Sequence, residues 1–314
     1  MIILTLETRS DKRKVMNTLV RCTFQRIVGL PQLEMPSKQT HDNEHVILVI
    51  GSVSLDRLLT VSKYPLADSK VRTESYHEIG GGNAANTASA MGLLQNASFL
   101  KKRVRIKFLS KVGDDRIGTQ LEKELQNSNV DTSSDLFRVG HEGSSTGFAT
   151  IVVELEGHTR TCLYTAGSAG ELSMEEVQSS DMEKLFNNVI HLHSDSRHTE
   201  AALILAQEAK KRGIPISVDC EKERRKSSFE SLIQLADILF TSSNSLASYL
   251  QRRELELEAS EGRIHLPDAV TSAHQKGEIM NKSHITELYT KSLAPIAFFT
   301  RWYPQVEKQV IVTQ

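Results

Sequence analysis

From His45 onward, short continuous apolar runs alternate with segments of helical periodicity. Val46–Ile50 is a continuous apolar run, as expected of a strand that is buried on both faces, and Ile106–Val112 is predicted as a second strand. Helical patterns follow over Arg116–Asn127 and, more strongly, over Thr199–Arg212. Shorter runs predict further strands at Val189–His193, Ile216–Val218, Ile238–Phe240 and Val310–Val312. This alternation predicts an α/β fold with a mostly parallel sheet covered by helices.

Two segments break the rhythm and have β character without a following helix. They are Val71–Ile79 and Gly147–Thr165, and the second resembles a hairpin that turns near Gly157. A small antiparallel sheet added to an α/β core is typical of a lid over a cleft. A rigid extension of the sheet edge is the alternative.

The strongest indication of a ligand site is a run of three glycines, which is followed by a helical pattern over Thr87–Leu94. Gly80-Gly81-Gly82 leads directly into Asn83 and, three residues later, Asn86. Glycine allows close approach of a ligand to the backbone, a helix start offers unpaired N–H groups, and asparagine amides suit hydroxyl groups. The run therefore predicts a site for a small, hydroxyl-rich molecule, and a tight turn without a ligand is the alternative.

Acidic residues near predicted strand ends provide further candidates. Asp56 closely follows the first strand, where α/β sheets bind ligands, and its carboxylate can accept two hydroxyl hydrogen bonds. Gly113-Asp114-Asp115 follows the Ile106–Val112 strand and is typical of a strand-to-helix turn with an acidic N-cap.

Two other clusters are candidates for a metal site and for a phosphate site. His191, His193 and Asp195 have the spacing of a metal-dependent hydrolase, but Ser196 stands where that motif needs a further histidine, so no metal is expected. Arg224, close after the Ile216–Val218 strand, is a candidate for the phosphate side, with a solvated charged helix start as the alternative.

Composition limits the classes of partner. The 314 residues contain 38 Lys and Arg against 39 Asp and Glu, which gives no electrostatic reason to expect nucleic acid or a membrane surface. The three cysteines are widely spaced, so a reducing compartment is inferred. Residues 1–44 are basic and are expected to be disordered or a targeting extension, which leaves a cytoplasmic location with a plastid or mitochondrion as the alternative. The polar stretch Glu254–Tyr289 is expected to be a long insertion or a poorly folded segment.

The order of these motifs resembles the ribokinase-like, or PfkB, family of carbohydrate kinases. The resemblance covers about His45–Gln314 and is most specific at Gly81–Asn86 and Lys111–Gly118, and Thr159–Cys162 resembles a plant-type branch. It implies a three-layer α/β/α fold with a small β lid, and transfer of phosphate from ATP with Mg²⁺ to a hydroxyl of a sugar or nucleoside. It also implies that two copies could pair through the lid.

The resemblance assigns residues only where the motifs match. Asp56, Gly81, Gly82, Asn83 and Asn86 match the substrate-binding positions, although ribokinases carry Lys at the position of Asn83. Asn244 matches the first residue of the family's Asn-x-x-Glu motif beside the Mg²⁺–phosphate site, but Ala247 stands in place of its Glu.

The family's catalytic base belongs to a Gly-Ala-Gly-Asp motif beyond the strand that Val310–Val312 resembles, and no such motif precedes Gln314. We therefore expect a C-terminally incomplete domain over 45–314, with no catalytic residue present and little or no kinase activity. A non-catalytic sugar-binding or regulatory protein is the alternative.

Overall fold

The computed structural model describes residues 44–94, 104–220, 227–242 and 309–313. The chain divides into two compact units, and the boundary lies between Ile216 and Ser217. The candidate site residues with described positions all lie in the first unit.

A parallel sheet forms the centre of the first unit. Its middle strand β1 (His45–Ile50) pairs in parallel with β4 (Val104–Val112) on one side and β9 (Val189–Ser194) on the other. The short strands β5 (Val130–Asp131) and β6 (Phe137–Val139) both pair in parallel with β4. Every residue of β1 after His45 is fully buried, as expected for a central strand covered on both faces.

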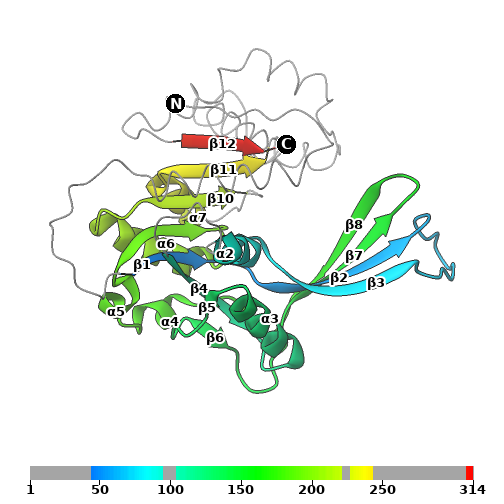
Figure 1. Cartoon of the computed structure of the whole chain (residues 1–314), viewed down its shortest axis with the longest axis horizontal. Coiled ribbons are helices and arrows are strands. Elements are labelled where there is room, and N and C mark those ends of the chain that lie inside the picture. The colour runs from blue at the N-terminus through cyan, green and yellow to red at the C-terminus, as the bar shows by residue number, and fades with distance from the viewer. Residues whose placement is uncertain (1–43, 95–103, 221–226, 243–308, 314) are drawn as a thin grey trace, which may run out of the picture. The chain divides into compact units, whose positions relative to one another are not determined.

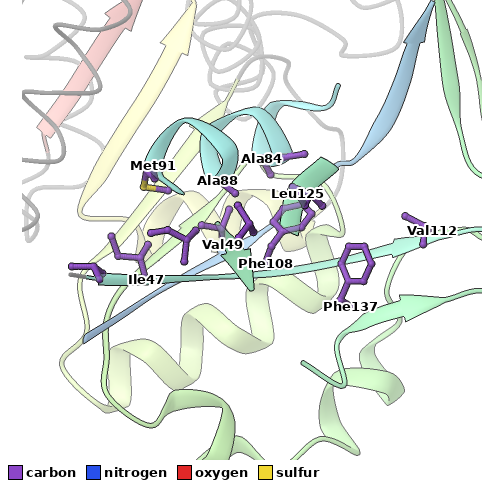
Figure 2. Close-up of a cluster of buried hydrophobic side chains, with 13 residues drawn as sticks. Ile47, Val49, Ala84, Ala88, Met91, Phe108, Val112, Leu125 and Phe137 are labelled. Atoms are coloured by element: carbon purple, nitrogen blue, oxygen red, sulfur yellow. The ribbon is translucent and has the colours of Figure 1, made fainter. Parts of the chain in front are cut away.

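Helices α2 (Asn83–Leu94) and α3 (Arg116–Asn127) cover one face of this sheet. Alternate side chains of β1 and β4 meet the small-residue face of α2, and Figure 2 shows Ala84 and Ala88 lying directly over Val49 and Phe108. The remaining β1 side chains face the opposite side of the sheet and are also buried. Alanine at these helix positions lets α2 approach the sheet closely, which places its first turn beside the end of β1.

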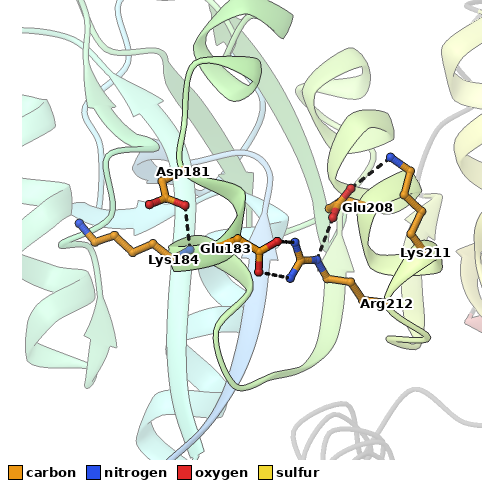
Figure 3. A network of polar contacts seen from close by, with 6 residues as sticks. All are labelled: Asp181, Glu183, Lys184, Glu208, Lys211 and Arg212. Atoms are coloured by element: carbon orange, nitrogen blue, oxygen red, sulfur yellow. Dashed lines mark hydrogen bonds and ion pairs between the residues drawn. The ribbon is translucent and has the colours of Figure 1, made fainter.

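Helix α6 (Thr199–Lys211) packs on β9 and on α4 (Met174–Gln178). Its C-terminal cap, Arg212, forms ion pairs with Glu208 in α6 and with Glu183 in α5 (Met182–Phe186), at 2.8 and 2.5 Å (Figure 3). These ion pairs link the end of α6 to α5. They contribute little to stability, because the Glu183 side chain is 84 % exposed.

A second sheet of four strands forms the lid, in the order β3-β2-β7-β8. Strand β2 (Ser54–Val61) lies between antiparallel β3 (Ser75–Gly81) and parallel β7 (Phe148–Glu154), and β8 (Thr159–Thr165) completes a hairpin with β7. Figure 1 shows these strands extending away from β1 and β4 as a layer of their own. The hairpin turn at Gly157 agrees with the sequence prediction.

The predicted lid was incomplete. The strand expected at Val71–Ile79 begins at Ser75 and ends at Gly81, and β2 was not predicted at all. Strand β2 carries apolar residues on both faces, since Leu58 lies on the same face as Asp56 while Leu55 and Leu59 lie on the other. It therefore lacks the strict alternation that identifies a half-buried strand from sequence.

The second unit begins one residue into β10 (Ile216–Cys220) and also contains helix α7 (Ser227–Leu235), β11 (Ile238–Ser242) and β12 (Gln309–Thr313). Strand β11 pairs in parallel with both β10 and β12, so the strand expected at Val310–Val312 is present. Within the described ranges, no helix is long and apolar enough to cross a membrane.

Candidate functional site

Asp56 and the glycine run lie together at the base of the lid. Asp56 lies within β2, not in a loop after the first strand, and the register of β2 with β3 places Gly81 diagonally across from it. A Cβ atom on Gly81 would lie 2.3 Å from Oδ2 of Asp56, so only glycine permits this approach. Burial raises the pKa of the half-buried Asp56 carboxyl above its ordinary value.

The Asp56 carboxylate retains its hydrogen-bonding capacity. Over the described ranges of the chain, no group donates a hydrogen bond to this side chain. A carboxylate can accept several hydrogen bonds, and one at a lid base beside bare glycine backbone is available to hydroxyl donors. Asn86, on the first turn of α2, is exposed, and its N–H donates to the Gly82 carbonyl at 2.8 Å.

Helix α2 starts at Asn83, four residues earlier than its predicted start at Thr87, and its first N–H groups bind the protein itself. The N–H of Asn83 donates to Ser52 Oγ at 3.1 Å, and that of Ala85 donates to the Ser52 carbonyl at 3.2 Å. The expectation of unpaired N–H groups facing a ligand is therefore wrong for this helix. Gly82, at φ 96°, makes the turn possible, because a Cβ there would lie 2.5 Å from the Ser52 carbonyl oxygen.

Asp195 holds the start of α2 to the end of β1. Its Oδ2 atom accepts hydrogen bonds from the N–H of Ala84 at 3.1 Å and the N–H of Ser52 at 2.9 Å, and the Ser52 hydroxyl donates to it as well. Its Oδ1 atom accepts from the N–H of Arg197 at 3.0 Å. Gly51 leaves the space for this carboxylate, since a Cβ there would lie 2.1 Å from Oδ1. Sequence reasoning considered Asp195 only as a metal ligand and missed this role.

The histidines beside Asp195 occupy separate buried environments. Nδ1 of His198 accepts the N–H of Leu172 at 2.9 Å, which places the ring proton on Nε2, facing the Gly51 carbonyl at 3.1 Å. Burial lowers the pKa of His198, and burial lowers that of His193 to about 4. Among the described residues, no three His, Cys, Asp or Glu side chains group as a metal site would require.

The Gly113-Asp114-Asp115 turn joins α3 to the segment that enters β7. Asp115 is the N-cap of α3, as predicted, and its Oδ1 atom accepts from the N–H of Gly118 at 2.7 Å. Its Oδ2 atom accepts the N–H of Thr146 at 2.8 Å. Burial alone would raise the pKa of Asp115, but these hydrogen bonds outweigh it and hold the pKa below its ordinary value.

An open groove of about 590 Å³ runs along the outer face of α3, and Asp56 and the glycine run are not among its lining residues. The two phosphate-side candidates, Asn244 and Arg224, lie outside the described residues, as do the basic extension and the polar stretch Glu254–Tyr289.

Comparison with known proteins extends these observations. The chain is 27 % identical over 205 residues to an ATP-dependent ribose-1-phosphate kinase of Halopiger xanaduensis, an alignment that spans 65 % of this chain and 64 % of that relative. The chain therefore matches less than two thirds of that relative's length.

Solved structures of sugar kinases share the fold of this chain. A fructokinase from Xylella fastidiosa superposes with a TM-score of 0.54 at 17 % identity, covering 86 % of this chain and 74 % of the other. A ribokinase from Arabidopsis thaliana, solved with ribose and ATP, gives a TM-score of 0.50 at 17 % identity, covering 65 % and 62 %. These likenesses confirm the ribokinase-like α/β fold.

The model of the pfkB family of carbohydrate kinases matches residues 44–277, which is most of the chain and includes the lid, the glycine run and the Asp115 turn. This chain therefore belongs to the PfkB family of carbohydrate kinases.

Proposed function

We propose that this protein is a PfkB-type phosphotransferase that phosphorylates a hydroxyl of a sugar or nucleoside, with ATP and Mg²⁺ as the donor system. The observation that carries the proposal is the Asp56 carboxylate, half-buried against Gly81 and without a hydrogen-bond donor in the described part of the chain. A polyol hydroxyl supplies the donor that this carboxylate lacks, and a lid above it excludes water from the reaction.

The arrangement around α2 favours a neutral acceptor group over an anion at this point. The first N–H groups of the helix are bound by Ser52 and Asp195, so the positive end of the helix dipole already faces a carboxylate. In the proposed arrangement, Asp56, Gly81, Gly82, Asn83 and Asn86 contact the acceptor. Asn244 and Arg224 are assigned to the phosphate side on sequence grounds alone.

The test measures binding and turnover on the same 314-residue chain. Isothermal titration with D-ribose, D-fructose and adenosine detects acceptor binding. A coupled ADP-release assay detects transfer, which is expected to be weak or absent because the 314 residues contain no Gly-Ala-Gly-Asp motif. Asp56→Ala should abolish binding, while Asp135→Ala, an exposed aspartate in a turn, should leave it unchanged. Absence of binding by the wild-type chain to any member of a broad sugar and nucleoside panel would contradict the proposal.

A sugar-binding protein without catalysis is the second candidate, because the 314 residues contain no Gly-Ala-Gly-Asp motif. Binding that depends on Asp56 without ADP release would favour it, and turnover that Asp56→Ala abolishes would exclude it. Self-association through the lid and the cellular compartment stay predictions. The exposed lid residues Tyr76 and Tyr164 favour the former.

A further inference from the structure

A row of polar side chains on α3 reaches the lid strand β3. Arg116, Gln120 and Glu124 follow one another at four-residue intervals, so they lie along one side of the helix. Nη1 of Arg116 donates to Gln120 Oε1 at 3.2 Å, and Nε2 of Gln120 donates to Glu124 Oε1 at 2.8 Å. The other Glu124 oxygen, Oε2, accepts the backbone N–H of Gly80 at 2.8 Å. The row therefore ends on the first residue of the glycine run.

Glu124 supplies a hydrogen-bond acceptor for a backbone N–H at the edge of the lid sheet. Strand β3 is an edge strand of its sheet, so alternate N–H groups point away from β2 and have no strand partner. Gly80 has such an N–H, and Glu124 supplies its acceptor. A Cβ on Gly80 would lie 2.7 Å from Glu124 Oε2, so the bare backbone of this position matches the carboxylate that approaches it.

A second contact ties the same strand to the same helix. Nη2 of Arg116 lies 3.6 Å from Oε2 of Glu78, two residues before Gly80. The other oxygen of Glu78 accepts from Arg57 Nε at 3.0 Å and from the Tyr76 hydroxyl at 2.7 Å. The end of β3 is therefore held at Glu78 and at Gly80, and the next residue is Gly81, which packs against Asp56.

We propose that Glu124 is a positioning residue for the acceptor site, which fixes the backbone at Gly80 and thereby holds Gly81 against the Asp56 carboxylate. The inference rests on the proposed function, because it assigns meaning to the distance between Gly81 and Asp56. Glu124 does not contact the acceptor in this proposal. It acts only through its hydrogen bond with the backbone N–H of Gly80.

The first test needs no ligand. Glu124→Ala should speed amide hydrogen exchange at Gly80 by about fivefold or more, the factor that loss of one net hydrogen bond implies. In the same variant, the pKa of the Asp56 carboxyl, followed by carbon NMR, should fall toward its ordinary value as the glycine run moves away. The matched control is Glu122→Ala, which removes the same charge from the same helix but contacts Thr132 in place of the lid.

Two further variants keep the test decisive. Glu124→Gln retains an oxygen for Gly80, so it should restore slow exchange and the raised pKa of Asp56, which separates the contact from the loss of charge. Gly80→Ala should reproduce the effects of Glu124→Ala by displacing the carboxylate, even if Glu124→Ala fails to fold. Wild-type exchange at Gly80 in Glu124→Ala, or an unchanged Asp56 pKa in both disruptive variants, would overturn the positioning role.

Binding then separates this inference from the proposed function. With D-ribose, D-fructose or adenosine as the probe, Glu124→Ala should raise Kd about tenfold while Glu122→Ala leaves it unchanged. A wild-type Kd in Glu124→Ala, despite faster exchange at Gly80, would refute the positioning role and leave the proposed function intact. Absence of binding to the wild-type chain would refute the proposed function, and the exchange and pKa results would still decide whether Glu124 holds Gly81 against Asp56.

Discussion

Two aspartates near the start of α2 have different environments and different uses. Asp56 is half-buried and keeps its oxygens available, whereas the fully enclosed Asp195 accepts hydrogen bonds from Ser52, Ala84 and Arg197. A carboxylate whose acceptors are all used by the protein stabilises structure, and one whose acceptors have no donor within the protein is suited to a ligand.

Asp195→Ala should therefore reduce stability strongly. The substitution leaves the buried N–H of Ala84 and the partly buried N–H of Ser52 without their acceptor, so we expect the free energy of unfolding to fall by about 3 kcal/mol. Urea unfolding measures the change. The control is Asp181→Ala, which removes the N-cap of the short helix α5 and should cost about 1 kcal/mol. Equal losses in the two variants would contradict the anchoring role of Asp195.

At this scale, sequence reasoning succeeded where the interaction is local. Asp115 caps the helix that begins with the next residue, and this was predicted from the motif alone. The partners of Asp195 lie 143 and 111 residues away in the chain, so no local pattern indicates them. The start of α2 was placed too late for the same reason, because its cap comes from Ser52 and Asp195 and not from the residues just before the helix.

Helix α2 contacts the C-terminal cap of α3 through Gly92, which has no side chain. A Cβ on Gly92 of α2 would lie 2.0 Å from the carbonyl oxygen of Ser128, the C-cap of α3. The backbones of the two elements thus approach more closely than any larger residue permits, which fixes where α3 ends relative to α2.

Gly92→Ala should destabilise the protein, although alanine favours helices by about 1 kcal/mol over glycine. The clash is with a backbone atom, so the helices must separate, and we expect a net loss of about 1–3 kcal/mol in the free energy of unfolding. Ser89→Ala on the same helix is the control and should be neutral or slightly stabilising. A gain in stability for Gly92→Ala in thermal or urea unfolding would show that the contact is looser than described.

Elements with a strong, regular pattern were predicted well, and those set by tertiary contacts were not. Strands β1 and β4 and helices α3 and α6 follow from apolar periodicity and capping residues. The two-residue strand β5 and the three-residue β6 are too short to produce any pattern, and they exist because β4 offers them hydrogen-bonding partners.

For the molecule as a whole, buried neutral histidines make stability depend on pH. Burial lowers the pKa of His193 to about 4 in the folded state, whereas the unfolded chain has the ordinary value of 6.5. Below pH 6.5 the unfolded state therefore binds a proton that the folded state excludes, so the contribution of His193 lowers stability as the pH falls toward 4 and is nearly constant above 6.5. The lowered pKa of His198 acts in the same direction.

Between pH 7.5 and pH 5, His193 should reduce the free energy of unfolding by about 2 kcal/mol. Urea unfolding across this range measures the slope, and His193→Gln should reduce it, leaving the part that His198 contributes. His77→Gln, at an exposed lid position, is the control and should leave the slope unchanged. Stability that rises on acidification would contradict the neutral, buried state of His193.

The link from Asp195 to Ser52 and Ala84 also has a consequence for the order of events during synthesis. Ser52 leaves the ribosome 143 residues before Asp195, and Ala84 leaves 111 residues before it. At typical elongation rates of about 5–20 residues per second, the start of α2 waits about 5–30 seconds for its cap. During that interval the nascent chain has Ser52 as an acceptor for the N–H groups of Asn83 and Ala85, but it lacks the Asp195 acceptor for Ala84. The start of α2 therefore reaches its final form only after β9 has been made.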